Sequence, residues 1–383
     1  MSFEFAAPRR IVFGEGTIVQ APEIVAGLGA RALVVEGATG RGAVLVEPLG
    51  ELGVVVTRLR VSGEPTTGLV EEGAALARRE GCDVVVAIGG GSVIDTAKAI
   101  AALLANRGEL RDYLEVVGQG RPLSERPAPL VAIPTTAGTG AEATRNAVLM
   151  VEEARVKVSL RSALMVPTVA LVDPELTYSL PPATTASTGL DALTQCIEPF
   201  VAPQANPLTD AVAREGMARA ARGLARAFRD GGDVDARRDM AVASLCGGLA
   251  LANAKLGAVH GFAAPLGGMF PVPHGVACAR LLPPVVAANV RALRERAPGS
   301  PARERYDEVA RILTGRADAS AEDAAAWLAA LGAELAVPPL SAYGVTQGDV
   351  PSVVDKARRA SSMQGNPIAL TDAELSSVLL AAL

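Results

Sequence analysis

Four side chains in the C-terminal half of the chain could bind a divalent metal ion. The chain has only two histidines, His260 and His274, and a Pro/Gly turn separates them. Asp191 and Gln195 lie four residues apart in a segment of helical character, which places both on one helix face. A carboxylate, an amide oxygen and two imidazoles can hold an ion and leave a position for a substrate oxygen. Spacing alone leaves open the alternative of local hydrogen bonds and buried structural histidines.

A glycine-rich stretch after an apolar run could bind phosphate. The run 84–88 (VVVAI) predicts a buried strand, three glycines follow at 89–91, and a helix is expected from Ser92. Glycines let the backbone approach an anion, and the N–H groups of a helix N-terminus favour negative charge. We expect Ser92 and Asp95 to form a capping box with Asp in place of Glu. A tight strand-to-helix turn without a ligand would have the same sequence.

A second loop is expected beside the first. The run 129–133 (PLVAI) predicts another strand, and the loop after it carries the hydroxyls of Thr135, Thr136 and Thr139 among small residues. Ligands of parallel sheets bind outside the carboxyl ends of the strands, where both loops fall. Small hydroxyls suit sugar and pyrophosphate oxygens, although a plain Thr/Gly turn remains the alternative.

Strands and helices must alternate to position these loops. Strands are predicted at 10–13, 32–35, 54–61, 84–88 and 129–133, and helices at 19–28, 44–52, 70–79 and 92–105. This alternation predicts βαβ units and a parallel sheet covered on both faces. The segments 156–160 and 168–173 are expected to pair with each other around the turn at 161–167.

The pattern changes after Pro181 and Pro182. From there to the C-terminus it predicts helix after helix, with Pro/Gly turns between them. We therefore expect two domains, a dinucleotide-binding α/β domain at 1–182 and a helical metal and substrate domain at 183–383.

Composition argues against several classes of partner. The formal net charge of −5 and the absence of a Lys/Arg-rich stripe with aromatics argue against nucleic acid. The first residues lack the apolar run of a signal peptide, and charges or Gly/Pro breaks interrupt every apolar segment of membrane-spanning length. Four widely spaced cysteines predict neither a disulfide framework nor a thiolate zinc knuckle. We expect a soluble, cytoplasmic protein with no nucleic-acid or membrane partner.

Seven motifs along nearly the whole chain resemble the iron-containing (group III) alcohol dehydrogenase family, a relative of glycerol dehydrogenase and dehydroquinate synthase. They are GGGSVIDTAKAIA at 89–101, IPTTAGTGAEAT at 133–144, PTVALVDPEL at 167–176, TGLDALTQCIEPF at 188–200, GAVHGFAAPLGG at 257–268, VPHGVACA at 272–279 and NPIALTDAEL at 366–375. Seven matches in family order are far more specific than any one of them. The resemblance implies an α/β N-terminal Rossmann-like domain and an all-α C-terminal domain, the dehydroquinate synthase-like architecture.

The resemblance also implies roles for individual residues. The pyrophosphate site corresponds to Gly89, Gly90, Gly91, Ser92 and Asp95, the ribose and nicotinamide contacts to Thr135, Thr136 and Thr139, and the family lysine that reaches the cofactor ribose to Lys157. The metal-ligand positions are Asp191, Gln195, His260 and His274, and of these Asp191, His260 and His274 are expected to be catalytic.

Three positions depart from the family pattern. Gln195 stands where the family usually has a histidine ligand, and a neutral carbonyl oxygen binds zinc or ferrous iron more weakly. Ala264 stands where the family usually has a further histidine, which removes a candidate proton-relay group. Gly37 aligns with an Asp that often accepts hydrogen bonds from the cofactor ribose, while Glu36 precedes it and Arg41 follows. The sequence therefore leaves NAD or NADP open.

The function that we expect is NAD(P)-dependent hydride transfer between nicotinamide and a small aldehyde, ketone or alcohol. A divalent metal, Fe²⁺ or Zn²⁺, would polarise the carbonyl oxygen. The alternatives are a metal-free reductase of the maleylacetate reductase type and an inactive nucleotide-binding homologue. The resemblance further implies a homodimer or a larger homo-oligomer.

Overall fold

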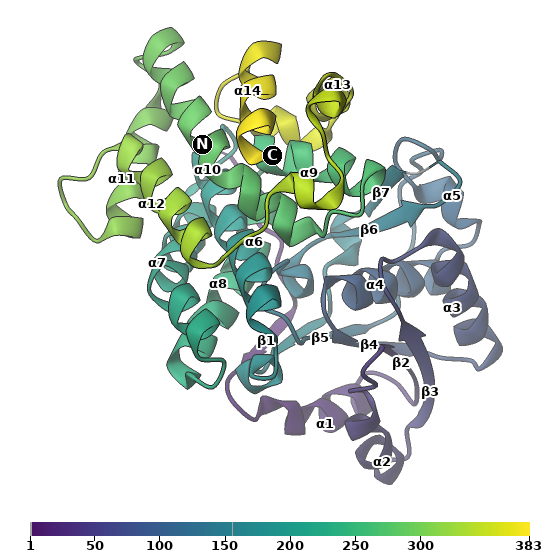
Figure 1. The fold of residues 1–383 in the computed structure, drawn as a ribbon. Coiled ribbons are helices and arrows are strands. Elements are labelled where there is room, and N and C mark those ends of the chain that lie inside the picture. The colour runs from purple at the N-terminus through teal and green to yellow at the C-terminus, as the bar shows by residue number, and fades with distance from the viewer. Residues whose placement is uncertain (1, 155) are drawn as a thin grey trace. The chain divides into compact units, whose positions relative to one another are not determined.

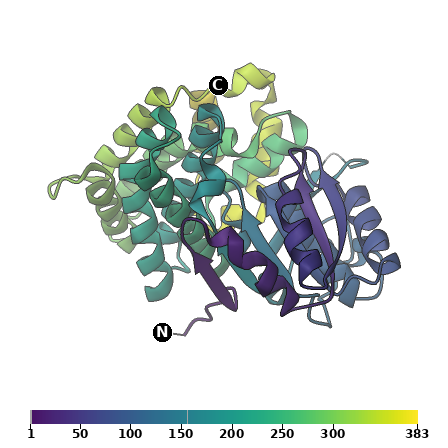
Figure 2. The ribbon, with the colours of Figure 1, turned by 90° about the horizontal axis from the view of Figure 1, so that it is seen from below.

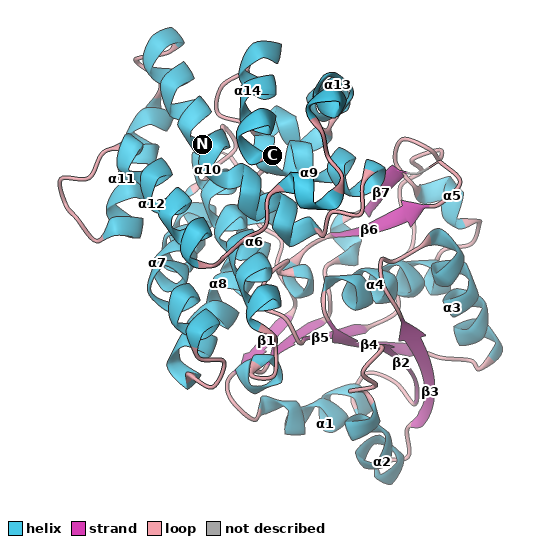
Figure 3. Cartoon of the chain, in the orientation of Figure 1, coloured by secondary structure: helices cyan, strands magenta, loops and turns pink. Residues whose placement is uncertain are grey.

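The computed structural model describes residues 2–154 and 156–383, which divide into two compact units (Figure 1). The α/β unit comprises residues 6–136 and 140–177. The helical unit comprises residues 137–139 and everything from Tyr178 onward, together with the N-terminal stretch up to Phe5. Figure 3 shows the strands gathered in the first unit and long helices in the second.

A parallel sheet forms the centre of the α/β unit. The order of its strands is β1-β8-β5-β4-β2-β3, with every paired neighbour parallel. The strands are β1 (Arg10–Phe13), β2 (Arg31–Gly37), β3 (Val55–Val61), β4 (Val84–Gly89), β5 (Leu130–Pro134) and β8 (Val169–Val172). The predicted alternation of strands and helices is confirmed.

Helices cover both faces of this sheet, because successive strand residues point to opposite sides. Ala32 and Val34 pack in one core with α1 (Ala21–Ala26) and α2 (Ala43–Glu51). Leu33 and Val35 pack in a second core with α3 (Thr67–Arg79) and α4 (Gly91–Ala105). Figure 2 shows helices on either side of the strands in this unit. The short α5 (Leu110–Tyr113) adds to the second core.

The predicted pairing of the segments 156–160 and 168–173 is wrong. The first forms β7 (Val156–Arg161), which pairs antiparallel with β6 (Asn146–Val151), a strand that the sequence analysis missed. The second forms β8, which lies between β1 and β5 in the main sheet. All four residues of β8 are buried, as expected for a strand covered on both faces, whereas burial in β6 alternates.

The helical unit contains the remaining long helices. They are α6 (Pro182–Val201), α7 (Pro207–Arg229), α8 (Val234–Asn253), α9 (Ala258–Met269), α10 (His274–Arg296), α11 (Pro301–Thr314), α12 (Ala321–Glu334), α13 (Val350–Arg359) and α14 (Asp372–Ala382). One apolar core of mostly Ala, Leu and Val side chains joins them. Short 3-10 helices complete the chain at Thr17–Gln20, Ala141–Ala143, Ala163–Met165, Pro174–Thr177, Leu340–Tyr343, Gln347–Asp349 and Ser361–Gly365.

A close approach of two helices brings the start of α10 against α6. A Cβ atom on Gly275 would lie 2.6 Å from the backbone oxygen of Ser187, so only glycine fits there without displacement. Proline sets both helix starts, since Pro182 occupies the first turn of α6 and Pro273 is the N-cap of α10. These features fix where His274 lies relative to Asp191.

Among the residues that the structure describes, one helix, α10, is long and apolar enough to cross a membrane by length and composition. In the structure 72% of its apolar window is buried inside the unit, and it carries Arg280 and the pair Pro283 and Pro284. A bent pair, α8 with α9, passes the same test only if it is counted as one span. Burial assigns α10 to the core of the helical unit.

Candidate functional site

The helical unit gathers a group of metal-binding side chains. One ligand atom from each of Asp191, His260, His274 and Cys278 lies within 4.8 Å of all the others. Asp191 comes from α6, His260 from α9, and His274 and Cys278 from the first turns of α10. The structure therefore brings the predicted ligands Asp191, His260 and His274 together, and it adds a thiol that the sequence analysis did not include.

Asp191 is fully buried and ionised. Burial would raise the pKa of its carboxyl group, but the positive charges of His274 and then His260 outweigh this and hold the pKa at about 2. Its Oδ1 atom lies 3.5 Å from His260 Nε2 and 3.6 Å from His274 Nε2. That oxygen has no hydrogen-bond partner among the described residues. A buried carboxylate oxygen in this state is suited to bind a cation.

The imidazole of His260 is oriented by a carboxylate that the sequence analysis missed. His260 Nδ1 lies 2.6 Å from Glu198 Oε2, and the backbone N–H of Val259 donates to Glu198 Oε1 at 2.7 Å. Burial lowers the pKa of His260, but acceptors at Cys278, Asp191 and Glu198 outweigh it and raise that pKa well above its usual range. With Nδ1 hydrogen-bonded to Glu198, Nε2 faces the metal group.

Gln195 lies on the same helix face as Asp191, as predicted. Its Nε2 atom donates to the backbone oxygen of Gly138 at 3.3 Å, so the amide oxygen Oε1 is the atom that remains to accept or to bind an ion. Oε1 is buried and, like Asp191 Oδ1, has no hydrogen-bond partner among the described residues. A hydrogen bond from the Gln195 side chain also contributes to the low pKa of Asp191.

The arrangement fits a divalent metal ion. Two imidazole nitrogens, one carboxylate oxygen and one sulfur converge, and that carboxylate oxygen has no hydrogen-bond partner within the part of the chain that the structure describes. Nitrogen, sulfur and carboxylate donors at such separations are the usual ligands of zinc and other first-row metals. An ion bound there would act as a Lewis acid on a substrate oxygen.

The predicted phosphate site lies at the start of α4. The N-cap is Gly90, and no side chain caps the helix. The predicted capping box of Ser92 and Asp95 is therefore wrong, because the helix begins at Gly91 and the Asp95 carboxylate accepts from the backbone N–H of Val148 at 3.0 Å. A helix N-terminus with no side-chain cap keeps its N–H groups for a ligand such as phosphate.

The two predicted loops are neighbours at the carboxyl end of the sheet. Gly89 in β4 pairs with Pro134 in β5, and the Thr135 N–H donates to the Gly89 oxygen at 2.9 Å. A Cβ atom on Gly90 would lie 3.4 Å from the Thr136 side chain. Thr135 and Thr136 thus lie beside the predicted phosphate site at the start of α4, whereas Thr139 belongs to the helical unit.

Lys157 pairs with an acid within the α/β unit. Its ammonium lies 3.0 Å from Glu64 Oε1, and its side chain is 8% exposed. The role that the family resemblance implies for Lys157, contact with the cofactor ribose, remains a prediction.

Glu36 and Gly37, at the carboxyl end of β2, face opposite sides of the sheet. Glu36 Oε1 accepts from Arg58 Nε at 2.8 Å and Glu36 Oε2 from the Gly42 N–H at 2.8 Å, so both oxygens are engaged. A Cβ atom on Gly37 would point to the other face, 3.8 Å from Val93 at the start of α4. The residue of β2 that faces the predicted phosphate site is therefore Gly37. The neighbouring Glu36 carboxylate forms an ion pair with Arg58.

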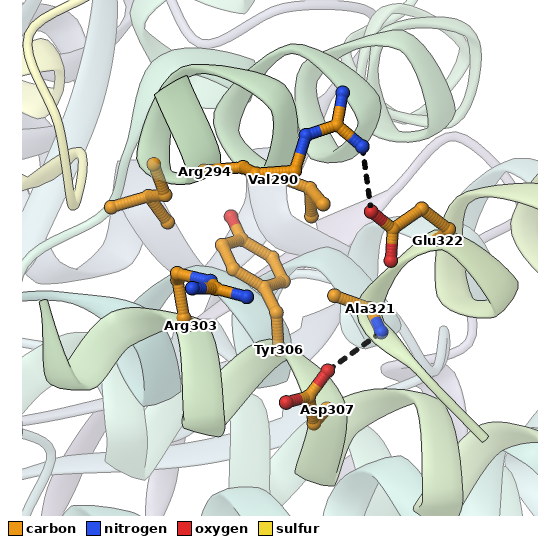
Figure 4. A pocket seen from close by; sticks show the side chains of 8 residues that line it. Val290, Arg294, Arg303, Tyr306, Asp307, Ala321 and Glu322 are labelled. Carbon is orange, nitrogen blue, oxygen red and sulfur yellow. Dashed lines mark hydrogen bonds and ion pairs between the residues drawn. The ribbon is translucent and has the colours of Figure 1, made fainter. Parts of the chain in front are cut away.

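A small pocket in the helical unit lies apart from these residues (Figure 4). It is lined by Val290, Leu293, Arg294, Arg303, Tyr306, Asp307, Ala321 and Glu322. Arg294 pairs with Glu322 at 3.3 Å, and Asp307 accepts from the Ala321 N–H at 2.8 Å. Because these charged groups bind one another and none of the metal group lines the pocket, we assign it no role.

Similarity to known proteins extends over nearly the whole chain. The family profile described as "Iron-containing alcohol dehydrogenase" matches residues 8–174, and "Fe-containing alcohol dehydrogenase family, C-terminal" matches 185–383. The chain is 37% identical over 374 residues to choline dehydrogenase of Bacillus subtilis, across 95% of this chain and 90% of that protein. It is 35% identical over 384 residues to alcohol dehydrogenase 4 of Saccharomyces cerevisiae, across 98% and 97%. A crystal structure of 1,3-propanediol oxidoreductase matches with a TM-score of 0.90, 34% identity and full coverage of both chains.

Proposed function

Because the chain belongs to the iron-containing alcohol dehydrogenase family, we propose that Asp191, His260 and His274 hold the divalent metal of an NAD(P)-dependent alcohol oxidoreductase. The substrate class is a small alcohol and the aldehyde or ketone that its oxidation gives. The observation that carries the proposal is the convergence of these ligand atoms, together with a buried Asp191 oxygen that has no hydrogen-bond partner among the described residues. The uncapped N-terminus of α4, after Gly90, supports dinucleotide binding.

In this mechanism the residues of the chain bind the metal ion and orient its ligands. The bound metal would supply Lewis-acid polarisation of the substrate oxygen, and the nicotinamide would supply or accept the hydride. Asp191 contributes negative charge, and Glu198 fixes the orientation of the His260 ring. Because Ala264 is exposed and has no titratable group, we propose that the alcohol proton exchanges with solvent without a side-chain relay there.

The direct test is turnover of purified protein supplied with Zn²⁺ or Fe²⁺. The substrates are choline and 1,3-propanediol, after the two similar proteins named above, and ethanol as a simple alcohol; formation of NADH or NADPH is followed by absorbance. We expect Asp191→Ala to lower kcat/KM by more than about 100-fold through loss of the metal. Cofactor binding, measured by fluorescence titration, should not change. Cofactor binding without turnover in the unmodified protein would favour the inactive homologue, and full turnover without metal would favour the metal-free reductase.

We propose NADP as the preferred cofactor. Glu36 is fully buried, and Arg58 and Gly42 engage both of its oxygens, which disfavours a contact between this carboxylate and the adenosine ribose. Gly37 brings no negative charge to the predicted phosphate site. The Arg60 side chain is 65% exposed, and its Nε atom lies 3.8 Å from Glu36 Oε1. An arginine near the end of β2 can accommodate a 2′-phosphate, and an acid there would repel it.

Gly37→Asp tests this preference. The position has room for a side chain, because a Cβ atom would make only an ordinary 3.8 Å contact with Val93 and no strained backbone angle is present. We expect kcat/KM for NADP relative to NAD to fall at least about tenfold, since like charges would meet. Gly50→Asp, on a helix with open space around it, is the matched control for added charge. A protein that uses NAD better than NADP before mutation would contradict the proposal.

We also propose a cytoplasmic location and a homodimer or larger homo-oligomer. Family membership supports both. Sedimentation equilibrium of the purified chain measures its state of association, and fractionation of cells measures its location.

A further inference from the structure

We propose that Cys278 supplies a fourth metal ligand as a thiolate, which makes the site an Asp/His/His/Cys set that favours Zn²⁺ over Fe²⁺. In this arrangement Gln195 stays outside the inner ligand set. The inference rests on the metal site proposed above and adds a ligand that neither the resemblance nor the spacing of the histidines implies.

Four of the six distances between the ligand atoms are close to those of a tetrahedral site, and the other two are at most 4.8 Å. A site with metal–nitrogen and metal–oxygen bonds of about 2.0 Å and a metal–sulfur bond of about 2.3 Å has edges of roughly 3.3 to 3.6 Å. Cys278 Sγ lies 3.6 Å from His274 Nε2 and 3.8 Å from His260 Nε2. Asp191 Oδ1 lies 3.6 and 3.5 Å from the same two nitrogens. Small inward shifts on metal binding would close these edges to bonding geometry.

Helix geometry holds the thiol in place. His274 and Cys278 lie four residues apart in α10, so their side chains lie along one face. Cys278 is fully buried, and its sulfur contacts the two imidazoles of the site. The buried Asp191 Oδ1, which lacks a hydrogen-bond partner among the described residues, provides the independent indication of a cation at this point.

Gln195 is the competing candidate for the fourth position. Its Oε1 is also buried without a partner among the described residues, but the amide is neutral and its Nε2 is bound to Gly138. A thiolate adds a negative charge and a softer donor, and such ligands select zinc over harder ions. On metal binding the Cys278 thiol would release its proton to solvent as the metal–sulfur bond forms.

Cobalt substitution detects a metal–sulfur bond without any assay of activity. Metal-free protein is loaded with one equivalent of Co²⁺, and cobalt content and near-ultraviolet absorption are measured. We expect an intense thiolate-to-cobalt charge-transfer band in the unmodified protein and in Gln195→Ala. Cys278→Ser should lose the band while it still binds cobalt through the other three ligands, with affinity lowered by at least about 10-fold. Cys246→Ser, which removes another buried thiol of the helical unit, is the matched control and should keep the band.

The outcomes separate this inference from the proposed function. Bound cobalt without the band in the unmodified protein would overturn Cys278 as a ligand, and so would a band that persists in Cys278→Ser. No bound cobalt at all would overturn both the ligand and the proposed metal site. A band that depends on Cys278 in a protein that turns over no substrate would support the ligand and contradict the proposed function.

Metal competition provides a second readout. Under anaerobic conditions with equal Zn²⁺ and Fe²⁺, the unmodified protein should take up predominantly zinc, and Cys278→Ser should shift the bound ratio at least about tenfold toward iron. An unchanged ratio would contradict the proposed role of the sulfur.

Discussion

The imidazole of His260 is held between Glu198 on one side and the metal group on the other. We expect Glu198→Gln to weaken metal binding by about 10- to 100-fold, because the ring loses the carboxylate that fixes its orientation and raises its basicity. Competition with a chromophoric chelator measures the metal affinity. Glu322→Gln, on the exposed surface of α12, is the control. An unchanged affinity in Glu198→Gln, with the fold intact by circular dichroism, would show that Glu198 does not position the ligand.

At the residue scale, the rarity of histidine and helical spacing singled out His260, His274 and Asp191 as candidates, and the family resemblance implied their role as metal ligands. Cys278 follows His274 by four residues in α10, so the same spacing rule could have found it. Paired cysteine motifs do not include Cys278, because the side chains that its sulfur contacts are imidazoles and not thiols. Glu198 had no such signal, since its contact with His260 joins residues far apart in sequence.

Glycine at the start of α10 determines how closely that helix approaches α6. A Cβ atom on Gly275 would meet the backbone of Ser187 at 2.6 Å, and backbone cannot move aside cheaply. We expect Gly275→Ala to lower the free energy of unfolding by about 1 to 3 kcal/mol and to weaken metal binding, because His274 moves with the helix. Denaturant unfolding and chelator competition measure the two effects.

The matched control is Gly332→Ala in α12, where a Cβ atom would meet nothing within 4 Å. Alanine has the higher helix propensity, so this variant should be as stable as the unmodified protein or more stable by up to about 1 kcal/mol. If Gly275→Ala behaves like this control, the close approach does not constrain the site.

A buried cluster of charge lies between α4 and the segment that follows β5. Lys98 Nζ donates to Thr144 Oγ1 at 2.7 Å and lies 3.8 Å from Asp95 Oδ1. Burial lowers the pKa of Lys98 to about 8 and raises the pKa of Glu142 to about 7. Glu142 Oε1 has no hydrogen-bond partner among the described residues, so its ionised form is poorly compensated.

This cluster predicts a pH dependence of stability. Because the pKa of Glu142 is higher in the folded state than its ordinary value of 4.5, its contribution to stability is complete below about pH 4.5 and is lost as pH rises to about 7. Glu142→Gln cannot ionise, so its stability relative to the unmodified protein should rise over that interval by up to about 3 kcal/mol. Urea unfolding at several pH values measures the difference. A constant difference from pH 4.5 to 7 would contradict the raised pKa.

At the scale of elements, hydrophobic periodicity and the Gly/Pro breaks predicted the first five strands and the helices between them within a few residues. They did not predict which strands pair. The segments that form β7 and β8 are close in sequence, which favoured a hairpin, but β8 is apolar at all four positions and its burial requires a place inside the main sheet. The strand that β8 pairs with thus depends on burial of both its faces. Closeness in sequence to β7 does not determine that pairing.

The whole molecule has separate cores in its two units. One apolar cluster lies in the helical unit and two lie on the faces of the α/β sheet. Zn²⁺ at 100 times its dissociation constant should stabilise the helical unit by about 2.7 kcal/mol, and NADP should act in the same way on the α/β unit. Hydrogen exchange measured by mass spectrometry should show zinc-dependent protection in α6, α9 and α10 and little in β4. Equal protection in β4 would contradict separate stabilisation.

The expected metal ligands, from Asp191 to Cys278, all lie after the last strand of the sheet in the chain. A ribosome therefore releases the predicted nucleotide-binding elements before any ligand of the ion has been made, and domains generally fold as units in that order. Metal acquisition becomes a late event in biosynthesis, in which three newly made helices are joined around one ion. A chain made without the ion would then have a complete sheet and a helical unit held by its own apolar core, whose expected ligands could take up the metal afterwards.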